Sequence, residues 1–267
     1  MPVRIVTDSS AGLPKDLAED LEITVLPLHV MSRGGATSTA GLTALELTAA
    51  YARQLERGGD DGVLALHLSK ELSSTWTNAV TAAGVFDGTV HVVDTNSAGM
   101  AIGAAAMAAA KLAKEGEDLE TCYQAAIDTL ERSELYLYLH RIDDLRKSGR
   151  LSPATALMSS ALATRPIMML REGKVELAAK TRTQTKAFIK LVEMIAEHAG
   201  GKPVFVAIQQ TEAREAANGL LRTMQAVLDE GSTYLMTDLD DAIGTHVGPG
   251  ALAVAVVYPQ DEDHPQV

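Results

Sequence analysis

Hydroxyl-bearing side chains gather where the predicted strands of the N-terminal half end. Serine, threonine and aspartate can cap the free amides at a helix N-terminus, and each such cap is worth about 1 kcal/mol. Several clusters on one edge of a parallel sheet, with helix N-termini pointing the same way, also favour a site for an anion. The clusters are Thr7-Asp8-Ser9-Ser10, Thr37-Ser38-Thr39, Ser69 with Ser73-Ser74-Thr75, and Asp94-Thr95-Asn96-Ser97.

A histidine, His246, stands among glycines and a proline in the stretch GTHVGPG. The apolar run 251–258 that follows has the composition of a buried strand, which predicts that His246 lies on the loop leading into that strand. The imidazole there either bonds a loop carbonyl or faces a ligand. The pattern alone leaves both interpretations open.

The absence of several known motifs narrows the range of possible ligands. There is no GxGxxG or GxxxxGK[ST] phosphate loop, no HExxH and no GxSxG. The one cysteine, Cys122, allows no internal disulfide and no thiolate metal cluster. We therefore predict neither a metal nor another cofactor. Hydroxyls and a histidine beside helices rich in alanine and methionine suit a carboxylate with a long apolar tail.

The elements that must position these residues alternate between strand and helix in the first half. Strands that read as continuous apolar runs between helices predict a mostly parallel sheet with helices on both faces. Strands are expected at 3–7, 23–31, 62–68 and 89–93, and helices at 42–57 and 74–83, with a further alanine-rich helix after Ser97.

The second half has a different pattern. The stretch 166–180 reads as a hairpin that turns at Glu172-Gly173, and residues 154–164 read as a helix. A mixed or antiparallel sheet with helices is therefore predicted. We expect two α/β domains, 1–155 and 156–267.

The charge and hydropathy of the chain limit the kinds of partner that it can bind. The 267 residues carry a net charge of −12, which argues against nucleic acid because phosphate binding needs a basic surface. The segment Arg141–Lys190 is an exception, with eleven Lys or Arg against four Asp or Glu, and it could dock an acidic partner. No apolar run approaches the ~20 residues that span a bilayer. We expect a cytoplasmic protein whose contact with a membrane, where it occurs, is transient.

Eight stretches in order resemble the DegV family, the fatty-acid-binding subunits of bacterial fatty acid kinase. They are IVTDSSAGLP, VLPLHV, LSKELSSTWTNA, HVVDTNSAGMAIG, LRKSGRLS, RPIMMLREGKV, KTRTQTKA and GTHVGPGA. The resemblance implies that the ligand lies between the two domains and that the protein is a carrier without catalytic activity of its own. Such a carrier buries a long-chain fatty acid and presents its carboxylate to an ATP-dependent kinase subunit for acyl phosphate formation. The kinase subunit would dock on the basic segment.

The same resemblance implies which residues hold the carboxylate. The family's Thr-Ser-Gln-Pro-Ser motif is aligned with TSTAG, its Ser-Gly-Thr-Tyr motif with SSTW, and its histidine before Gly-Pro-Gly with His246. Departures include the missing proline of the first motif, Ser74 in place of glycine, and a stretch before Thr37 about twenty residues shorter than usual. The predicted carboxylate ligands are Thr37, Ser73 and His246, with Ser74, Arg182, Asp94 and Thr95 in support.

Two other functions fit the same residues. A serine hydrolase or acyltransferase would use Ser73 or Ser74 as nucleophile and His246 as base, although no third triad member is evident. A regulatory module that senses a small acid would keep the fold without the lipid role. Identification of the ligand separates these possibilities.

Overall fold

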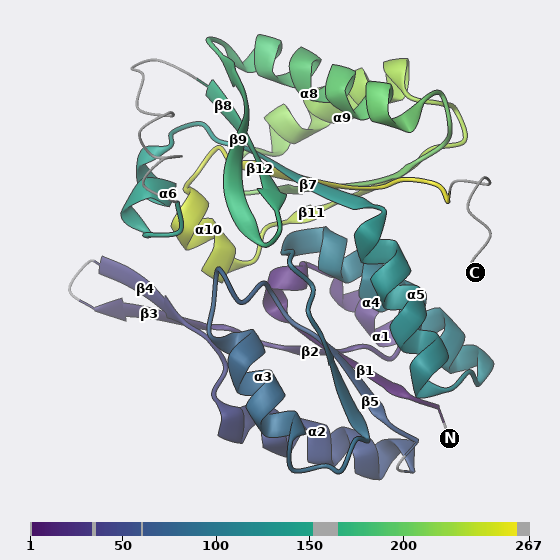
Figure 1. Ribbon diagram of the computed structural model, residues 1–267. Coiled ribbons are helices and arrows are strands. Elements are labelled where there is room, and N and C mark those ends of the chain that lie inside the picture. The colour runs from purple at the N-terminus through teal and green to yellow at the C-terminus, as the bar shows by residue number, and fades with distance from the viewer. Residues whose placement is uncertain (1, 34–35, 60, 152–164, 261–267) are drawn as a thin grey trace.

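The structure, a computed structural model, describes residues 2–33, 36–59, 61–151 and 165–260. A parallel four-stranded sheet is built by the N-terminal part of the chain and a mixed six-stranded sheet by the C-terminal part. Figure 1 shows the six-stranded sheet above the four-stranded one, with helix α4 (Gly99–Glu115) between them. The predicted α/β class, with these two kinds of sheet, is confirmed.

Helices cover both faces of the four-stranded sheet, and its two central strands are the most deeply buried. Every residue of the strand Val63–Leu66 is buried, and helices pack on the two sides of the sheet. In order across the sheet the strands are β2 (Thr24–Leu26), β1 (Arg4–Asp8), β5 (Val63–Leu66) and β6 (Val90–Val93). One face carries α2 (Ala44–Gly58) and α3 (Thr75–Ala83), and the other carries α1 (Lys15–Asp20), α4 and α5 (Leu119–Glu131).

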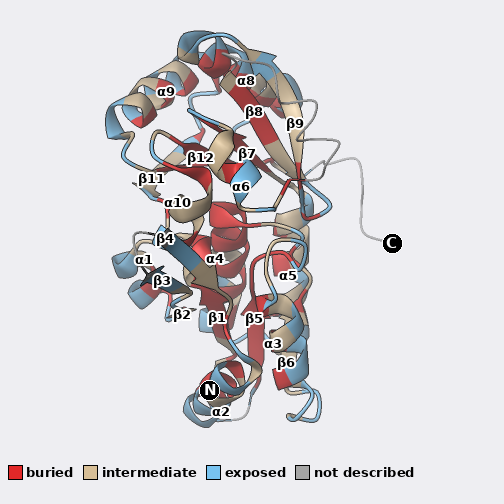
Figure 2. Ribbon diagram, turned by 90° about the vertical axis from the view of Figure 1, so that its left-hand side faces the viewer, coloured by how far each residue is buried: buried red, intermediate tan, exposed pale blue. Residues whose placement is uncertain are grey.

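Helix α4 belongs to the cores of both halves. Ile102 and Ala105 pack in the core of the four-stranded sheet, whereas Met100 and Ala101 pack in the core on the inner face of the six-stranded sheet. Alanine on every side lets two layers approach the helix closely. Figure 2 accordingly shows α4 buried along most of its length.

One face of the six-stranded sheet packs on helix α4, and its other face carries two helices. The outer helices are α8 (Gln184–Ala199) and α9 (Arg214–Val227). The predicted hairpin is confirmed, since Arg171 pairs with Lys174 around the Glu172-Gly173 turn. In order the strands are β11 (Thr233–Asp238), β10 (Phe205–Gln210), β12 (Leu252–Val257), β7 (Ser133–Tyr138), β8 (Arg165–Arg171) and β9 (Lys174–Thr181).

The single strand predicted at 23–31 is wrong. The chain leaves β2 at Pro27, whose ring fixes φ and whose nitrogen cannot donate to a ladder. It then forms β3 (His29–Arg33), which pairs with β4 (Ala36–Ala40) as a separate two-stranded sheet, here called the arm. The Thr37-Ser38-Thr39 cluster, predicted beyond the end of the strand at 23–31, therefore lies in strand β4.

The loop predicted around His246 is also wrong. His246 lies in the last turn of a short helix, α10 (Asp241–Val247). The helix begins with Asp240, whose side chain accepts from the amide of Ala242, and it ends at Gly248 with a φ of 75°. The helix predicted at 154–164 lies outside the described residues.

The predicted domain boundary at residue 155 stays a prediction. Strand β7 already pairs within the six-stranded sheet, so the chain passes from one sheet to the other between α5 and β7. Among the described helices, none combines the length and the apolar composition needed to cross a membrane.

Candidate functional site

A cavity of about 520 Å³ lies between the two halves of the molecule. It opens beyond the carboxyl ends of β1 and β5, where the strand order of the four-stranded sheet reverses, which is the usual ligand position in open parallel sheets. Both halves line it with apolar side chains. The apolar lining includes Leu28, Leu68, Leu72, Ala98, Leu135, Leu137, Leu170, Val175, Leu239, Ile243, Val247 and Ala253.

Seven polar side chains line this cavity; Thr43 bonds Glu46 and Asn78 bonds the carbonyl of Leu42, and the other five form one rim. They come from segments that are far apart in the sequence, and each of the five lines the cavity. We call this set the polar rim: Thr39 of β4, Ser73 and Ser74 before α3, Arg150 after α6 (Asp143–Lys147), and His246 of α10.

Gly41 lets these segments meet. A Cβ atom on Gly41 would lie 2.7 Å from Thr75 Oγ1, 2.9 Å from Ser73 Oγ and 3.1 Å from Ser74 Oγ. Real Cβ atoms do not approach so closely, so only glycine brings the chain after β4 against the turn before α3. The three hydroxyls therefore converge beside the arm.

A relay of hydrogen bonds joins Arg150, His246 and Thr39. Arg150 Nη1 lies 3.4 Å from His246 Nδ1, and His246 Nε2 lies 2.7 Å from Thr39 Oγ1. A guanidinium can only donate, so Nδ1 accepts and Nε2 carries the ring proton, which it donates to Thr39. The hydroxyl hydrogen of Thr39 is then available to a ligand in the cavity.

Burial determines which side chains of the polar rim are charged at neutral pH. Burial, and after it the positive charge of Arg150, lowers the pKa of His246 to about 4. Burial also lowers the pKa of Arg150, but a guanidinium keeps its charge at neutral pH. The rim therefore presents one cation, a neutral imidazole and hydroxyl donors, which is a set suited to a carboxylate.

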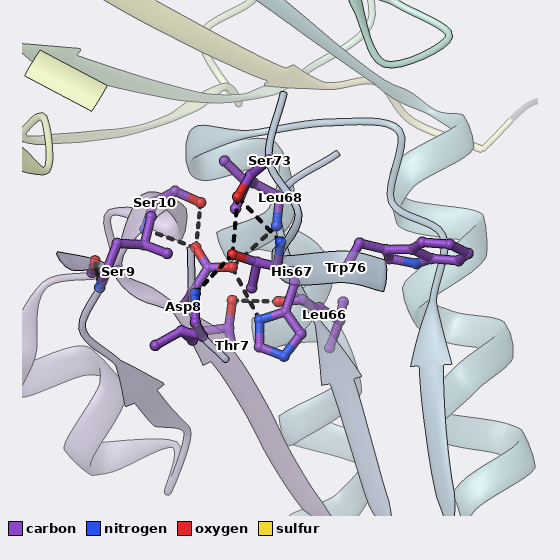
Figure 3. A network of polar contacts seen from close by, with 12 residues as sticks. Thr7, Asp8, Ser9, Ser10, Leu66, His67, Leu68, Ser73 and Trp76 are labelled. Carbon is purple, nitrogen blue, oxygen red and sulfur yellow. Dashed lines mark hydrogen bonds and ion pairs between the residues drawn. The ribbon is translucent and has the colours of Figure 1, made fainter. Parts of the chain in front are cut away.

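The loop that carries Ser73 rests on a buried polar network (Figure 3). The Asp8 carboxylate is fully buried and accepts from the amides of Ser10 and Leu68 and from the Ser10 hydroxyl. It also lies 3.0 Å from His67 Nδ1, and His67 Nε2 lies 2.9 Å from the hydroxyl of Tyr51. A carboxylate with this many donors is stable without solvent, so Asp8 fixes the start of the loop.

Two predicted supporting residues serve this scaffold and do not line the cavity. Thr95 is buried and its hydroxyl donates to the carbonyl of His67 over 2.6 Å. Asp94 forms an ion pair of 2.6 Å with Lys70, which lies 5.0 Å from the centre of the Trp76 ring. Thr95 therefore holds the ends of two neighbouring strands together beneath the site, whereas the partly exposed Asp94–Lys70 pair contributes little.

Two further predicted residues also lie outside the cavity. Thr37 is exposed and lines only an outer polar pocket of about 360 Å³, here called the vestibule, which shares Thr39, Arg150 and His246 with the cavity. Arg182 is exposed between β9 and α8 and lines neither space. Ser73, Ser74 and His246 do line the cavity, and their role in binding stays a prediction.

Sequence reasoning missed Thr39 and Arg150. The signal for Thr39 was the capping box at the start of α2, where Thr43 and Glu46 bond each other's amides. If the serine that ends the family's Thr-Ser-Gln-Pro-Ser motif corresponds to the capping residue Thr43, the motif begins at Thr39 and not at Thr37. Arg150 belongs to the quoted stretch LRKSGRLS, but its side chain was not singled out.

The rim does not have the geometry of a hydrolase. The Ser73 hydroxyl lies 3.0 Å from Thr75 Oγ1 and accepts from the Thr75 amide, whereas the ring nitrogens of His246 face Thr39 and Arg150. A nucleophile and its base must share a hydrogen bond, and neither Ser73 nor Ser74 shares one with His246. Within the described residues, no group of three or more His, Cys, Asp or Glu is arranged to hold a metal ion.

The structure is an α/β protein of two sheets with an apolar chamber between them that ends at a polar, cationic rim. The family model described as "Uncharacterised protein, DegV family" matches residues 31–259. The chain belongs to the DegV family.

Individual relatives agree with this assignment. A DegV domain-containing protein of Corynebacterium glutamicum is 62% identical over 259 residues, which are 97% of this chain and 94% of the relative. The crystal structure of a DegV family protein from the same organism, 61% identical, has a TM-score of 0.95 and covers 97% of this chain and 99% of that one. DegV, a fatty acid binding protein from Bacillus subtilis, has a TM-score of 0.85 at 27% identity, covering 97% of this chain and 100% of that one.

Proposed function

We propose that this protein binds a long-chain fatty acid, with the tail in the cavity and the carboxylate at the polar rim. The observation that carries the proposal is the cavity itself, about 520 Å³ of mostly apolar space that ends at Thr39, Ser73, Arg150 and His246. Each buried methylene of the tail adds about 0.8 kcal/mol of binding free energy. The rim supplies the donors that a desolvated carboxylate requires.

The relatives support the same ligand. The Bacillus subtilis protein and a DegV family protein from Thermus thermophilus, each 27% identical to this chain, are described as fatty acid binding. Both share the fold over 97% of this chain, with TM-scores of 0.85 and 0.88. The shared fold, together with the apolar chamber of this chain, favours the same chemical class of ligand.

Native mass spectrometry of the purified protein, followed by organic extraction, tests this proposal. We expect a mass excess of one fatty acid per chain, and the extract identifies the chain length. A ligand-free mass without a thermal shift on adding palmitate contradicts the proposal and favours the small-acid sensor.

The carboxylate is further proposed to be presented to a partner kinase for acyl phosphate formation, with the kinase supplying ATP. The vestibule supports this step, because it lies next to the rim and is polar throughout. To the shared residues it adds Thr37, Ser38, Asp144, Lys147, Ser148 and Thr245. Lys147 and Arg141 of the basic segment are largely exposed, at 78% and 69%, and could meet an acidic partner.

Trapping of acyl phosphate with hydroxylamine tests the kinase step. With a fatty acid kinase subunit, ATP and bound palmitate, we expect hydroxamate from the wild-type protein and less from an Arg141→Glu/Lys147→Glu variant that still binds palmitate. Equal yields from the two proteins contradict docking through the basic segment. Absence of hydroxamate from a wild-type protein that holds palmitate contradicts the kinase step alone.

A further inference from the structure

The tip of the β8–β9 hairpin sits directly on the loop that carries Ser73. The buried hydroxyl of Ser69 donates to the carbonyl of Gly173 over 3.1 Å. Gly173 has a φ of 77°, and a Cβ atom there would lie 2.3 Å from Ser69 Oγ and 3.2 Å from Asn96 Oδ1. The hairpin of the six-stranded sheet thus fits into a socket on the other half of the molecule, and only glycine permits this fit.

Ser69 connects this socket to the polar rim. Its carbonyl accepts from the amides of Leu72 and Ser73 over 3.0 and 3.1 Å, and its hydroxyl accepts from the amide of Glu71. Its own amide donates to the carbonyl of Ser97 over 2.8 Å. The turn that ends in Ser73 is therefore built around Ser69.

The same turn also holds the cation of the rim. Arg150 Nε donates to the carbonyl of Leu72 over 3.2 Å, and Arg150 Nη1 donates to the carbonyl of Ser148 over 2.9 Å. A shift of the turn would move Leu72 and Ser73 together, and Arg150 would lose one of its two carbonyl partners. The ion pair of Lys174 with Glu71 is exposed at 3.8 Å and contributes little.

We propose that Ser69 is a positioning residue for the head-group site. Its hydroxyl holds the hairpin tip against the turn and so sets the spacing between Ser73 and Arg150. Asp8 fixes the start of the loop through the amide of Leu68, while the stretch from Ser69 onward depends on Gly173. Ser69 does not line the cavity and acts through its neighbours. The inference rests on the proposed function.

Binding of palmitate and of its methyl ester tests this role in Ser69→Ala and Gly173→Ala proteins. Each change removes or displaces the same contact, from opposite halves of the molecule. We expect the affinity for palmitate to fall about tenfold in each, as for the loss of one or two hydrogen bonds. The ester carries no charge and should bind within about twofold of wild type. The double variant should lose little more than either single one, because the two residues share one contact.

Two matched controls separate positioning from general damage. Gly201 has a φ of 78°, and a Cβ atom added there would have nothing within 4 Å, so Gly201→Ala carries the backbone cost without the clash. Ser232 is a buried serine that accepts from the amide of Val204 far from the rim, so Ser232→Ala controls for a lost buried hydroxyl. Both should bind palmitate within about twofold of wild type.

Equal losses for acid and ester, or a loss in Gly201→Ala as large as in Gly173→Ala, would overturn the inference. Unchanged palmitate binding in Ser69→Ala or in Gly173→Ala would do the same. Wild-type protein that binds neither acid nor ester contradicts the proposed function itself, so the two failures are distinguishable.

Discussion

Thr39 Oγ1 lies 2.7 Å from His246 Nε2, although 207 positions separate the two residues in the chain. Thr39 comes from the arm, and His246 comes from α10, the helix that precedes strand β12 in the chain. Because both side chains line the cavity, this bond closes the rim from the two halves of the molecule. It also orients the Thr39 hydroxyl, because His246 Nε2 donates to its oxygen and leaves its hydrogen for the cavity.

The two threonines of the arm should behave differently on substitution. Thr39→Val keeps the shape of the side chain and removes the hydroxyl that faces the cavity, whereas Thr37→Val changes an exposed residue of the vestibule. We expect palmitate affinity to fall by about 1–2 kcal/mol in Thr39→Val and to stay unchanged in Thr37→Val. Isothermal titration measures both. The reverse ranking would restore the sequence-based assignment to Thr37.

Removal of Arg150 should weaken binding more than removal of one hydroxyl. The guanidinium is the charged donor of the rim and also bonds the carbonyls of Leu72 and Ser148. We expect Arg150→Ala to lose about 2–3 kcal/mol of palmitate affinity, because hydrogen bonds to charged groups are the stronger ones. Arg150→Lys should recover little, since an ammonium cannot reproduce the planar fork. Full recovery by lysine would show that only the charge matters.

Stability should fall in acid partly because of His246. An unfolded histidine has a pKa near 6.5, and the folded pKa is about 4. Between these values the unfolded chain binds more protons, so the free energy of unfolding decreases as the pH falls from 6.5 to 4 and the contribution is complete above 6.5. Urea unfolding of the ligand-free wild type and a His246→Gln variant at pH 7.5 and 4.5 checks this. The variant should lose less stability in acid, and parallel pH curves would contradict the assignment.

The sequence predicted the α/β class and the β8–β9 hairpin, because these depend on local signals. The apolar run at 63–66 and the Glu172-Gly173 turn are visible without tertiary structure. The arm and α10 were missed for a different reason. A two-stranded hairpin and a helix of seven residues gain little from local propensity and depend on their contacts with each other.

The choice between Thr37 and Thr39 could not be made from hydroxyl clusters alone. In a strand, successive side chains point to opposite faces, so residues 37 and 39 share a face and Ser38 takes the other. Which threonine reaches the cavity depends on where the arm ends, and that is set by Gly41 and the cap at Thr43. The cap is a local signal, whereas the fit of Gly41 against residues 73–75 is a contact between segments that neither segment shows alone.

Gly41→Ala should damage the rim directly. The added carbon would lie within 3.1 Å of the hydroxyls of Ser73, Ser74 and Thr75. Overpacking at such a contact costs about 1–3 kcal/mol, and we expect both lower thermal stability and weaker palmitate binding. Gly219→Ala, in helix α9 with its nearest neighbour at 4.0 Å, is the control and should be neutral or slightly stabilising. Similar behaviour of the two variants would mean that the rim tolerates the arm at a greater distance.

Ala253 should limit the length of the acid that the cavity accepts. It is 5% exposed on β12, lies opposite Leu137 of β7 in the ladder, and both side chains line the cavity. Ala253→Leu adds three carbons to the wall, which displaces a similar length of ligand chain. Because each buried methylene is worth about 0.8 kcal/mol, affinity for the longest acids should fall by about 2 kcal/mol, whereas acids that do not reach the wall should bind as before. Titration with saturated acids of increasing length measures the change. A uniform loss at every length would show that the substitution disturbs the fold or the rim and that Ala253 does not face the tail.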